Sequence, residues 1–440
     1  MNIKIQNCNA NSSEALGSKF KITTPIRAKF SGQNSKISIT GSKSETNRLL
    51  LLQALYPKIS IENASNSDDS DVMTKALLHN SQTATIPPSA AREIDIHHAG
   101  TAMRFLTAYF AQKEGQEVVL TGSSRMQERP ISVLVDALKQ LGADIKYVNN
   151  VGYPPISICG KKLTKNQVSL PANVSSQYIS ALLLIAPKLE NGLELTLTGQ
   201  ITSVPYIKMT LALLNEIGAE TSFVDNIIAV NHHPSTNLQT ITVESDWSSA
   251  SYFYSIIALS EIGTNIKLST FKQNSLQGDS VLSTIYQDFG VETVFNIDKT
   301  ITLTKKENHK HESINLDLNY APDIAQTIVV TCFGLGIGCH LSGLHTLKIK
   351  ETDRLLALQN ELTKLGALIS VSDASLTLEI SSKINTDITI KTYQDHRMAM
   401  AFAPLALRTN ITIENAEVVS KSYPNFWQDL KQIGFIISQT

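Results

Sequence analysis

Apolar and polar residues recur in one order along the chain: an amphipathic, helix-like run ends at an apolar residue plus glycine, and a strand-like run follows. This order is found in LKQLGADI, LLNEIGAE, YQDFGVET, LTKLGALI and LKQIGFII, whose glycines are Gly142, Gly218, Gly290, Gly366 and Gly434. Their spacings of 76, 72, 76 and 68 residues are too long for a solenoid repeat. Glycine is expected there because helices often end in the left-handed conformation that glycine adopts at least cost. The pattern predicts a duplicated folding unit.

The same interval counted back from Gly142 reaches DVMTKALLHN (71–80), an amphipathic run without the final glycine, so we expect six units. A β-branched run that stops at a polar loop precedes most of the helices. Examples are VVLTGSSRMQERP (118–130), LTLTGQITSVPY (195–206), CHLSGLHTLKIKETDR (339–354) and ITIENAEVVSKSYP (411–424). Each unit is therefore predicted to run strand, loop, helix, strand, which indicates an α/β fold with helices on sheets.

Composition narrows the classes of function. A chain of 440 residues exceeds one ordinary core and is expected to form two domains or more. No apolar run approaches the ~20 residues that cross a bilayer, so no membrane span is expected. The 38 Lys and Arg residues balance 39 Asp and Glu residues, so no overall field favours nucleic acid. Neither an apolar signal core nor a CxxC spacing is present, which predicts a cytoplasmic location.

Basic residues are placed in the loops that follow strands. Arg125 and Arg129 follow TGSS, Lys350 and Arg354 follow SGLHTLKI, and Lys421 follows ENAEVVS. Each of them alone is best interpreted as a solvated surface charge. Because they recur at equivalent positions of repeated units, where loops gather at one end of the scaffold, we expect them to converge on an anion.

Two further strings combine small residues with a cation at a predicted helix start. GSKSETNR (41–48) places Lys43 and Ser44 just before the predicted helix LLLLQALY, although it lacks the Walker spacing. HAGTAMRFL (98–106) places Gly100 at the opening of a helix that carries Arg104. The amides at a helix start carry positive potential and bind anions, so both strings are candidate phosphate or carboxylate sites.

Polar and acidic strings leave a structural and a functional interpretation open. Ser175, Ser176 and Gln177 open a predicted helix, where they could hold a phosphate, but helix capping is the preferred interpretation. Asp323 opens another helix in APDIAQT, and DHRMAM begins at Asp395; capping or pairing with arginine is again preferred. No string has the spacing of a metal or dinucleotide site, so neither a metal nor an organic cofactor is expected.

Read together, these strings resemble a known enzyme family. GSKSETNR, AGTAMR, SRMQERP, VSSQ, SVPYIKMT, SSASYF, NSLQGD, PDIAQT, IKETDR, QDHRMAM and KSYP are similar, in order and along nearly the whole chain, to motifs of the 5-enolpyruvylshikimate-3-phosphate synthases. The resemblance implies two domains of three βαβαββ units each, an inside-out α/β barrel of the enolpyruvyl transferase type. Residues 1–42 and 245–440 would form one discontinuous domain and residues 43–244 the inserted one, with the active site in the cleft between them.

The resemblance also implies a reaction. The enolpyruvyl group of phosphoenolpyruvate would pass to the 5-hydroxyl of shikimate 3-phosphate with release of phosphate, a shikimate-pathway step toward chorismate and the aromatic amino acids. Shikimate 3-phosphate is then expected at Lys43, Ser44, Arg48, Ser175, Ser176, Gln177, Ser203, Tyr206, Asp323 and Lys350. Phosphoenolpyruvate is expected at Lys43, Gly100, Arg125, Gln177, Arg354, Arg397 and Lys421. Addition followed by elimination would need a base for the hydroxyl proton, Asp323, and a proton donor to C3, either Lys43 or Glu351.

Some positions depart from the common family pattern. His98 stands where asparagine usually precedes AGTAMR, and Phe105 stands where many members have proline. Thr346 and Lys348 occupy the positions where N-x-R is frequent. Threonine keeps a hydroxyl but reaches less far than the asparagine that contacts shikimate 3-phosphate in the family, so that contact is not assigned to Thr346.

Two alternatives remain open at this point. The related UDP-N-acetylglucosamine enolpyruvyl transferases share the fold but use a cysteine in the loop that here reads GSSRMQERP. A non-catalytic scaffold that binds anions would be favoured by the loss of Asp323 or Lys43, and both are present. A monomer with only its two small-molecule substrates as partners is expected.

Overall fold

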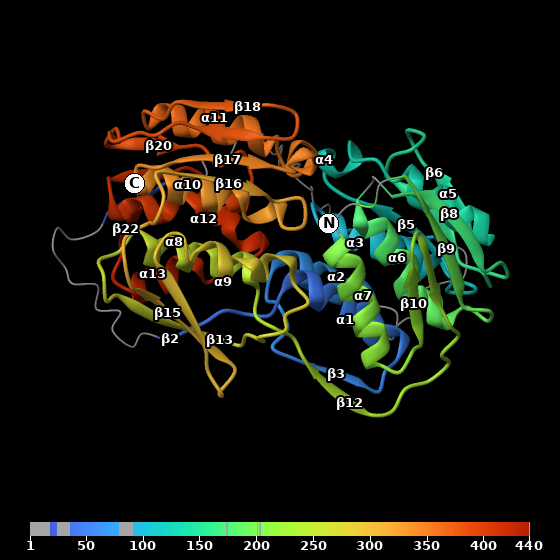
Figure 1. The fold of residues 1–440 in the computed structure, drawn as a ribbon. Coiled ribbons are helices and arrows are strands. Elements are labelled where there is room, and N and C mark those ends of the chain that lie inside the picture. The colour runs from blue at the N-terminus through green and yellow to red at the C-terminus, as the bar shows by residue number, and fades with distance from the viewer. Residues whose placement is uncertain are drawn as a thin grey trace, which may run out of the picture.

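The computed structural model describes residues 18–23, 36–78, 91–172, 175–199, 201 and 204–439, so Ser203, a site residue expected from the sequence, lies outside the described residues. The ribbon forms two halves side by side, one coloured mainly yellow to red and the other mainly blue to green (Figure 1). Over the described ranges the strands form six sheets, five of four strands and one of two. The number of sheets equals the number of units predicted from the glycine spacing.

The four-stranded sheets share one pattern of directions, a parallel pair at one edge followed by antiparallel neighbours. In spatial order they are β4 (Arg92–Asp95), β5 (Glu117–Thr121), β7 (Ile156–Cys159) and β6 (Asp144–Tyr147); β8 (Gln167–Pro171), β9 (Leu193–Thr198), β11 (Ile227–Val230) and β10 (Thr221–Val224); β2 (Lys36–Ser38), β13 (Asn265–Ser269), β15 (Thr300–Lys305) and β14 (Val291–Phe295); β16 (Ser313–Asp317), β17 (Gly338–Ser342), β19 (Leu376–Leu378) and β18 (Ile369–Val371); β20 (Ile388–Ile390), β21 (Ile411–Ile413), β1 (Phe20–Thr23) and β22 (Ile436–Gln439). Repetition of the same topology confirms the prediction of a duplicated α/β unit.

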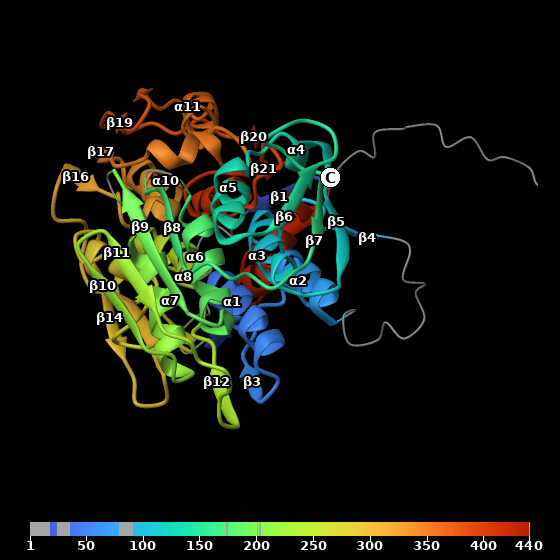
Figure 2. The ribbon, with the colours of Figure 1, turned by 90° about the vertical axis from the view of Figure 1, so that its right-hand side faces the viewer.

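Helices occupy the interior of each half. The helices are α1 (Lys43–Leu55), α2 (Asp68–Leu78), α3 (Gly100–Ala111), α4 (Ser124–Gln127), α5 (Ser132–Leu141), α6 (Ser176–Ile185), α7 (Val204–Glu216), α8 (Trp247–Ala258), α9 (Leu282–Ile285), α10 (Ala325–Leu335), α11 (Arg354–Lys364), α12 (His396–Phe402) and α13 (Phe426–Gln432). Nearly every residue of α3, α6, α8 and α10 is buried. A helix that is apolar all round has no face for water, so it lies inside with sheets around it. Figure 2 shows α3 and α6 between the sheet of β8 and β9 and the sheet of β5 and β7.

The five recurring glycines end helices as expected. Their φ angles are 105° at Gly142, 98° at Gly218, 76° at Gly290, 99° at Gly366 and 105° at Gly434. Each follows a helix by no more than a few residues and precedes a strand within three. The left-handed conformation predicted for these positions is therefore confirmed, and a side chain with a Cβ would be strained at each.

The helix predicted to follow GSKSETNR begins earlier than expected. Helix α1 starts at Lys43, so Lys43 and Ser44 form its first turn instead of preceding it. Glu45 lies in that first turn, and its side chain is buried. Lys43 and Ser44 thus lie where backbone amides of the first turn have no partner within the helix.

The chain crosses between the two halves at two adjacent segments. Strand β2 precedes α1 in the chain but pairs with β13 of the other half, and β12 (Gln239–Thr242) precedes α8 but pairs with β3 (Ile59–Glu62). An isolated antiparallel bridge joins Gly41 to Ser245, and the Ser42 amide donates to the Glu244 carbonyl at 2.8 Å. The two crossing segments are therefore hydrogen-bonded to each other.

Buried apolar side chains form two separate clusters. One contains buried residues between Leu49 and Val243, and the other contains Ile22, Ile37, Ile39 and buried residues between Trp247 and Phe435. The short η helices between these elements are η1 (Ala186–Lys188), η2 (Gly278–Val281), η3 (Pro322–Ile324), η4 (His345–Ile349), η5 (Ala403–Leu407) and η6 (Ala416–Lys421).

Glu45→Gln is expected to stabilise the protein by about 1–3 kcal/mol at pH 8 and to change little at pH 5. Burial raises the pKa of Glu45 to about 7; Lys272 opposes the shift and Glu244 adds to it. Because the folded pKa lies above the unfolded value, folding favours the protonated form, and ionisation at pH 8 reduces stability. Glutamine keeps the shape without the charge. Urea unfolding at both pH values measures the difference, and Glu114→Gln, on an exposed turn, is the control. Equal effects at the two pH values would contradict the assignment.

Candidate active site

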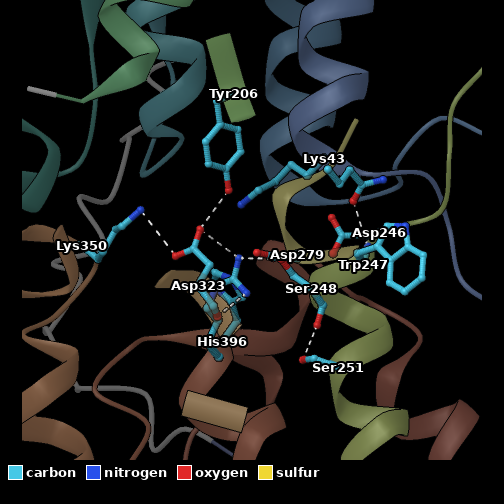
Figure 3. A network of polar contacts seen from close by, with 12 residues as sticks. Lys43, Tyr206, Asp246, Trp247, Ser248, Ser251, Asp279, Asp323, Lys350 and His396 are labelled. Atoms are coloured by element: carbon cyan, nitrogen blue, oxygen red, sulfur yellow. Dashed lines mark hydrogen bonds and ion pairs between the residues drawn. The ribbon is translucent and has the colours of Figure 1, made fainter. Parts of the chain in front are cut away.

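The carboxylate of Asp323 lies at the centre of a polar network in which both halves take part (Figure 3). Its Oδ1 is 2.8 Å from Arg354 Nη1 and 3.5 Å from Lys350 Nζ. Its Oδ2 is 3.5 Å from Arg397 Nη2 and accepts a 3.3 Å hydrogen bond from the hydroxyl of Tyr206, which comes from α7 of the other half. Three cations and a phenol thus surround one buried carboxylate.

These neighbours determine the protonation state of Asp323. Burial acts to raise the pKa of Asp323, but Lys350, Arg397 and Arg354 outweigh it and hold the pKa well below its usual range. Asp323 is therefore a carboxylate at neutral pH. Its contribution to stability is present above the unfolded pKa of ~3.9 and is lost only as the pH falls through the lower folded value.

Arg354 is the most enclosed cation of the network, with a side chain that is 2% exposed. Besides Asp323, its guanidinium contacts Asp395 Oδ2 at 2.7 Å through Nε and Glu351 Oε2 at 2.8 Å through Nη2. Burial alone would lower the pKa of Arg354, but Asp395, Glu351 and Asp323 raise it above the usual range. Helix starts position the group: Asp353 caps α11 and Asp395 caps α12 with their side chains.

Glu351 is ionised in this arrangement. Burial acts to raise the pKa of Glu351, whereas the cations Arg354 and Lys43 hold it well below the usual range. His396 is neutral, because burial and then Lys43 lower its pKa well below the usual value. Glu351 therefore has no carboxyl proton to donate in this state.

Lys43, the first residue of α1, lies at the site. Its Nζ is 3.2 Å from Asp69 Oδ2, and the other oxygen of Asp69 is 4.0 Å from His98 Nε2. One cavity is lined by Lys43, Ser44 and Tyr206 from one half and by Arg397 from the other. The structure thus gathers four of the residues expected from the sequence.

The starts of α3 and α6, which carry Gly100 and Gln177, are joined by a hydrogen bond. The Nε2 of Gln177 donates to Thr101 Oγ1 at 3.0 Å, which joins the starts of α6 and α3. A Cβ on Gly100 would lie 2.6 Å from Nη1 of Arg129, so only glycine leaves room for that guanidinium. Ser175 caps α6 by accepting from the amide of Gln177, as the structural interpretation of VSSQ predicted.

Other expected residues lie further from this network. Arg48 is 3% exposed, and its donors are engaged by Thr210 at 2.8 Å, Ser180 at 2.9 Å and the carbonyl of Ser44 at 2.7 Å. Arg125 has a 59% exposed side chain and pairs with Glu128 at 2.8 Å on the surface. In this state Arg48 and Arg125 are thus not among the contacts of Asp323.

Lys421 and Thr346 complete the expected set. Lys421 Nζ donates to the carbonyl of Gln394 at 2.7 Å, and burial lowers its pKa, with Glu351 and Asp395 opposing. The hydroxyl of Thr346 is buried in η4 without a hydrogen-bond partner. Lys348 instead turns to Asp373 at 2.6 Å on the surface.

Sequence reasoning missed several polar residues of the site. Asp69, Ser248 and Asp279 contact Lys43 or Arg397 directly or through one hydroxyl. Asp69 lies in SNSDDSD (65–71), a string whose local pattern indicates only the cap of the next helix, and Asp279 lies in NSLQGD, a motif from which no single residue was selected. Their role depends on partners far along the chain, which local patterns do not reveal.

The arrangement is suited to small anions. Lys43 and Arg397 line one cavity, and Lys350 shares the carboxylate of Asp323 with Arg397. Protein carboxylates already pair with these three cations, so small anions can replace the carboxylates as partners. Within the described ranges, no group of three or more His, Cys, Asp or Glu residues is placed to hold a metal ion. Over the same ranges, no helix combines the length and apolar character needed to cross a bilayer.

Comparison with known proteins gives a consistent result. Residues 28–430 match the family model of EPSP synthase (3-phosphoshikimate 1-carboxyvinyltransferase). A Bacteroides fragilis (strain YCH46) protein named 3-phosphoshikimate 1-carboxyvinyltransferase is 46% identical over 404 residues, covering 91% of this chain and 95% of that protein. A Haemophilus influenzae protein of the same name is 34% identical over 437 residues, covering 92% and 98%.

Solved structures show the same fold. EPSP synthase from Acinetobacter baumannii superposes with a TM-score of 0.77 at 21% identity, covering 96% of this chain and 100% of that chain. The enolpyruvyl transferase NikO from Streptomyces tendae gives 0.70 at 13% identity, covering 96% and 99%. The expected enolpyruvyl transferase-like α/β fold is confirmed.

Proposed function

The chain belongs to the EPSP synthase family, and from that membership we infer that its cleft transfers the enolpyruvyl group of phosphoenolpyruvate to the 5-hydroxyl of shikimate 3-phosphate. The products are 5-enolpyruvylshikimate 3-phosphate and phosphate. The observation that carries the inference is the buried Asp323, held as a carboxylate by Arg354, Lys350 and Arg397 beside Tyr206. Both substrates carry a phosphate and a carboxylate, and these cations offset their mutual repulsion.

We propose substrate subsites on the two sides of Asp323. Lys350, Tyr206, Ser44 and the start of α6 would hold shikimate 3-phosphate, together with the other residues expected from the sequence. Arg354, Arg397, Lys421 and Gly100 would hold phosphoenolpyruvate, with Arg125 joining from the surface. The contact between Gln177 and Thr101 supports a shared boundary between the two subsites.

Asp323 would act as the base in the addition step. It would accept the proton of the 5-hydroxyl while that oxygen bonds to C2 of phosphoenolpyruvate and C3 gains a proton. When substrate anions engage Lys350 and Arg397, these cations hold the Asp323 charge less strongly, so its pKa rises and it becomes a better base. Elimination then removes a proton from the new methyl group and releases phosphate.

Lys43 is the proton donor to C3 that we propose in preference to Glu351. The ammonium of Lys43 lines the same cavity as Tyr206 and Arg397. Glu351 is kept ionised by Arg354 and Lys43, so it has no proton to give before the substrates bind. In the elimination, the neutral Lys43 would take a proton back from the methyl group, and Asp323 would pass its proton to the departing phosphate. Asp69, at 3.2 Å from Lys43 Nζ, would hold the restored ammonium in place.

The two apolar clusters are proposed to be the cores of two domains. Residues 43–244 would form the inserted domain, and residues 1–42 with 245–440 the discontinuous one. The paired crossing segments at Gly41 and Ser245 support a boundary at these positions. The catalytic cleft would lie between the domains, because Tyr206 and Asp323 meet from the two clusters.

We further propose a cytoplasmic monomer with no partner besides its substrates. Balanced charge supports the absence of a nucleic-acid partner, since such partners require a basic surface.

A phosphate-release assay tests the reaction. Phosphate should be released from phosphoenolpyruvate only when shikimate 3-phosphate is present, and not with UDP-N-acetylglucosamine. Release with the UDP-sugar but not with shikimate 3-phosphate would instead assign the chain to the related transferase. If no phosphate were released with either acceptor, an anion-binding scaffold would be supported.

Arg125→Ala is expected to weaken phosphoenolpyruvate binding by about 2–5 kcal/mol, because a desolvated anion would lose its charged partner. Arg125 pairs only weakly with Glu128 at the surface, so little opposes its movement to the substrate. The measurement is the KM for phosphoenolpyruvate at saturating shikimate 3-phosphate. Glu128→Ala is the matched control and should leave this KM unchanged or lower it. An unchanged KM in Arg125→Ala would remove Arg125 from the subsite.

A further inference from the structure

The hydroxyl of Ser248 links Arg397 to a buried carboxylate that the proposed reaction does not use. Ser248 lies in the first turn of α8, and its Oγ donates to Asp279 Oδ2. The same Oγ accepts a hydrogen bond from Arg397 Nη2 at 3.3 Å. Figure 3 shows Ser248 directed toward Asp279 beside the Asp323 network. The three side chains thus form a chain of hydrogen bonds from η2 through α8 to α12.

The donor and acceptor capacities of the three side chains determine the direction of each hydrogen bond. A hydroxyl has one proton, while a carboxylate only accepts and a guanidinium only donates. Asp279 therefore fixes the Ser248 proton on its own side and leaves the lone pairs of Oγ directed at Arg397. Without Asp279, the hydroxyl could rotate its proton toward the guanidinium and repel it.

Asp279 is itself held in place. It is 5% exposed, and its neighbour Gln277 accepts from the Trp247 amide at 2.9 Å and donates to the Ser245 carbonyl at 2.9 Å. A Cβ on Gly278 would lie 2.6 Å from the carbonyl of Tyr320, so the backbone is closely packed there. Ser245 belongs to the crossing between the halves, so Asp279 is fixed relative to that crossing.

Arg397 has few other constraints. Its Nη1 donates to the carbonyl of Asp323 at 3.1 Å, and Nη2 lies 3.5 Å from Asp323 Oδ2. Both of these contacts involve Asp323, whose carboxylate has to handle a proton in the proposed reaction. Ser248 provides the contact to a different element, one that takes no part in the chemistry.

We propose that Asp279, acting through the hydroxyl of Ser248, positions the guanidinium of Arg397 for the anionic groups of phosphoenolpyruvate. Asp279 and Ser248 are positioning residues and do not touch the reacting atoms. The proposal rests on the proposed function, since it assumes that Arg397 binds that substrate.

Kinetics of substituted proteins test the proposal. Ser248→Ala should raise the KM for phosphoenolpyruvate by about 2–10-fold, as expected for one lost hydrogen bond, with kcat and the KM for shikimate 3-phosphate nearly unchanged. Asp279→Ala should have a similar effect, and the double variant should be no worse than either single one, because both act through the same contact. Ser248→Thr keeps the hydroxyl and should restore the wild-type KM.

Ser251→Ala is the matched control. It removes another buried hydroxyl of α8, one that donates to the Ser248 carbonyl at 2.6 Å and does not contact Arg397. Its KM for phosphoenolpyruvate should stay at the wild-type value. An equal rise in Ser251→Ala, or equal rises in the KM of both substrates in Ser248→Ala, would overturn the proposal in favour of a purely structural role.

The pH dependence gives a second readout. Burial and then Asp323 raise the pKa of Asp279 to about 6, with Arg397 and Ser248 opposing and Asp246 adding to the rise. Tyr206 and Lys43 face the same cavity. Since Asp279 is a carboxylate above pH 6 and takes up a proton below it, the wild type should lose the positioning contact as the pH falls. The KM ratio of Ser248→Ala to wild type should be largest at pH 8 and approach one at pH 5; the titration of the substrate's phosphate cancels in this ratio.

A crystal structure of Ser248→Ala separates this proposal from the proposed function. The guanidinium of Arg397 should leave its position beside the Asp323 carbonyl, whether or not the wild type releases phosphate with shikimate 3-phosphate. An unmoved guanidinium, or a KM ratio that does not change with pH, would overturn the positioning role. An inactive wild type with a displaced guanidinium in the variant would refute only the proposed function.

Discussion

Arg354→Ala is expected to lower the free energy of unfolding by about 3–5 kcal/mol, because it leaves buried carboxylates without their cation. Arg354 is enclosed by Asp395, Asp323 and Glu351, at 2.7, 2.8 and 2.8 Å. The side chain of Asp395 is fully buried, so water cannot replace the guanidinium there. Activity should be lost as well, since the proposed phosphoenolpyruvate subsite loses a cation.

Urea unfolding of Arg354→Ala at pH 7 measures this loss. Lys348→Ala is the matched control, because Lys348 also forms a close ion pair, at 2.6 Å to Asp373, but with side chains that are 40% and 94% exposed. Exposed pairs of this kind contribute about 0–1 kcal/mol. If both variants lost the same small amount, the buried network would have no special role in stability.

Asp323→Asn is expected to reduce kcat by about 10²–10⁴-fold, the range associated with loss of a general base. Asparagine keeps the size of the side chain and can still accept from Tyr206, but it cannot take the hydroxyl proton. Substrate affinity should be unchanged or higher, because Asp323 competes with substrate anions for Lys350 and Arg397.

Single-turnover rates and substrate dissociation constants separate these effects. Asp373→Asn, on the exposed partner of Lys348, is the control and should retain full activity. Weaker substrate binding with an unchanged rate per bound substrate would show that Asp323 binds substrate and is not the base.

The repeated unit and the family could both be predicted from the sequence. The glycine spacing predicted six units because a left-handed helix end is a local event that depends on neighbouring residues. The motif order predicted the family, and both the family model and the relatives confirm it. The predicted start of α1 was too late in the chain, because the polar string before the leucines has no periodic apolar signal.

The sequence predicted only in part which candidate residues meet at the site. Of the loop cations expected to converge, Lys350 and Arg354 do meet at Asp323, whereas Arg125 pairs with Glu128 at the surface. Arg48 has a similar motif position, yet its guanidinium is directed to Thr210 and Ser180 inside one half. Arg48 and Arg354 look alike in the sequence. Only the packing of their helices shows that Arg354 faces Asp323 and Arg48 faces Thr210.

Local order along the chain was thus set by near neighbours and is visible in the sequence: the repeated unit, the glycine at each helix end and the identity of the charged groups. Contacts between distant residues were decided by packing. Strands β2 and β12 pair across the halves instead of within their own units. Arg354 meets Asp395 across 41 positions, and Arg397 meets Ser248 across 149. Such pairings depend on how whole helices and sheets fit together, and no spacing in the chain encodes them directly.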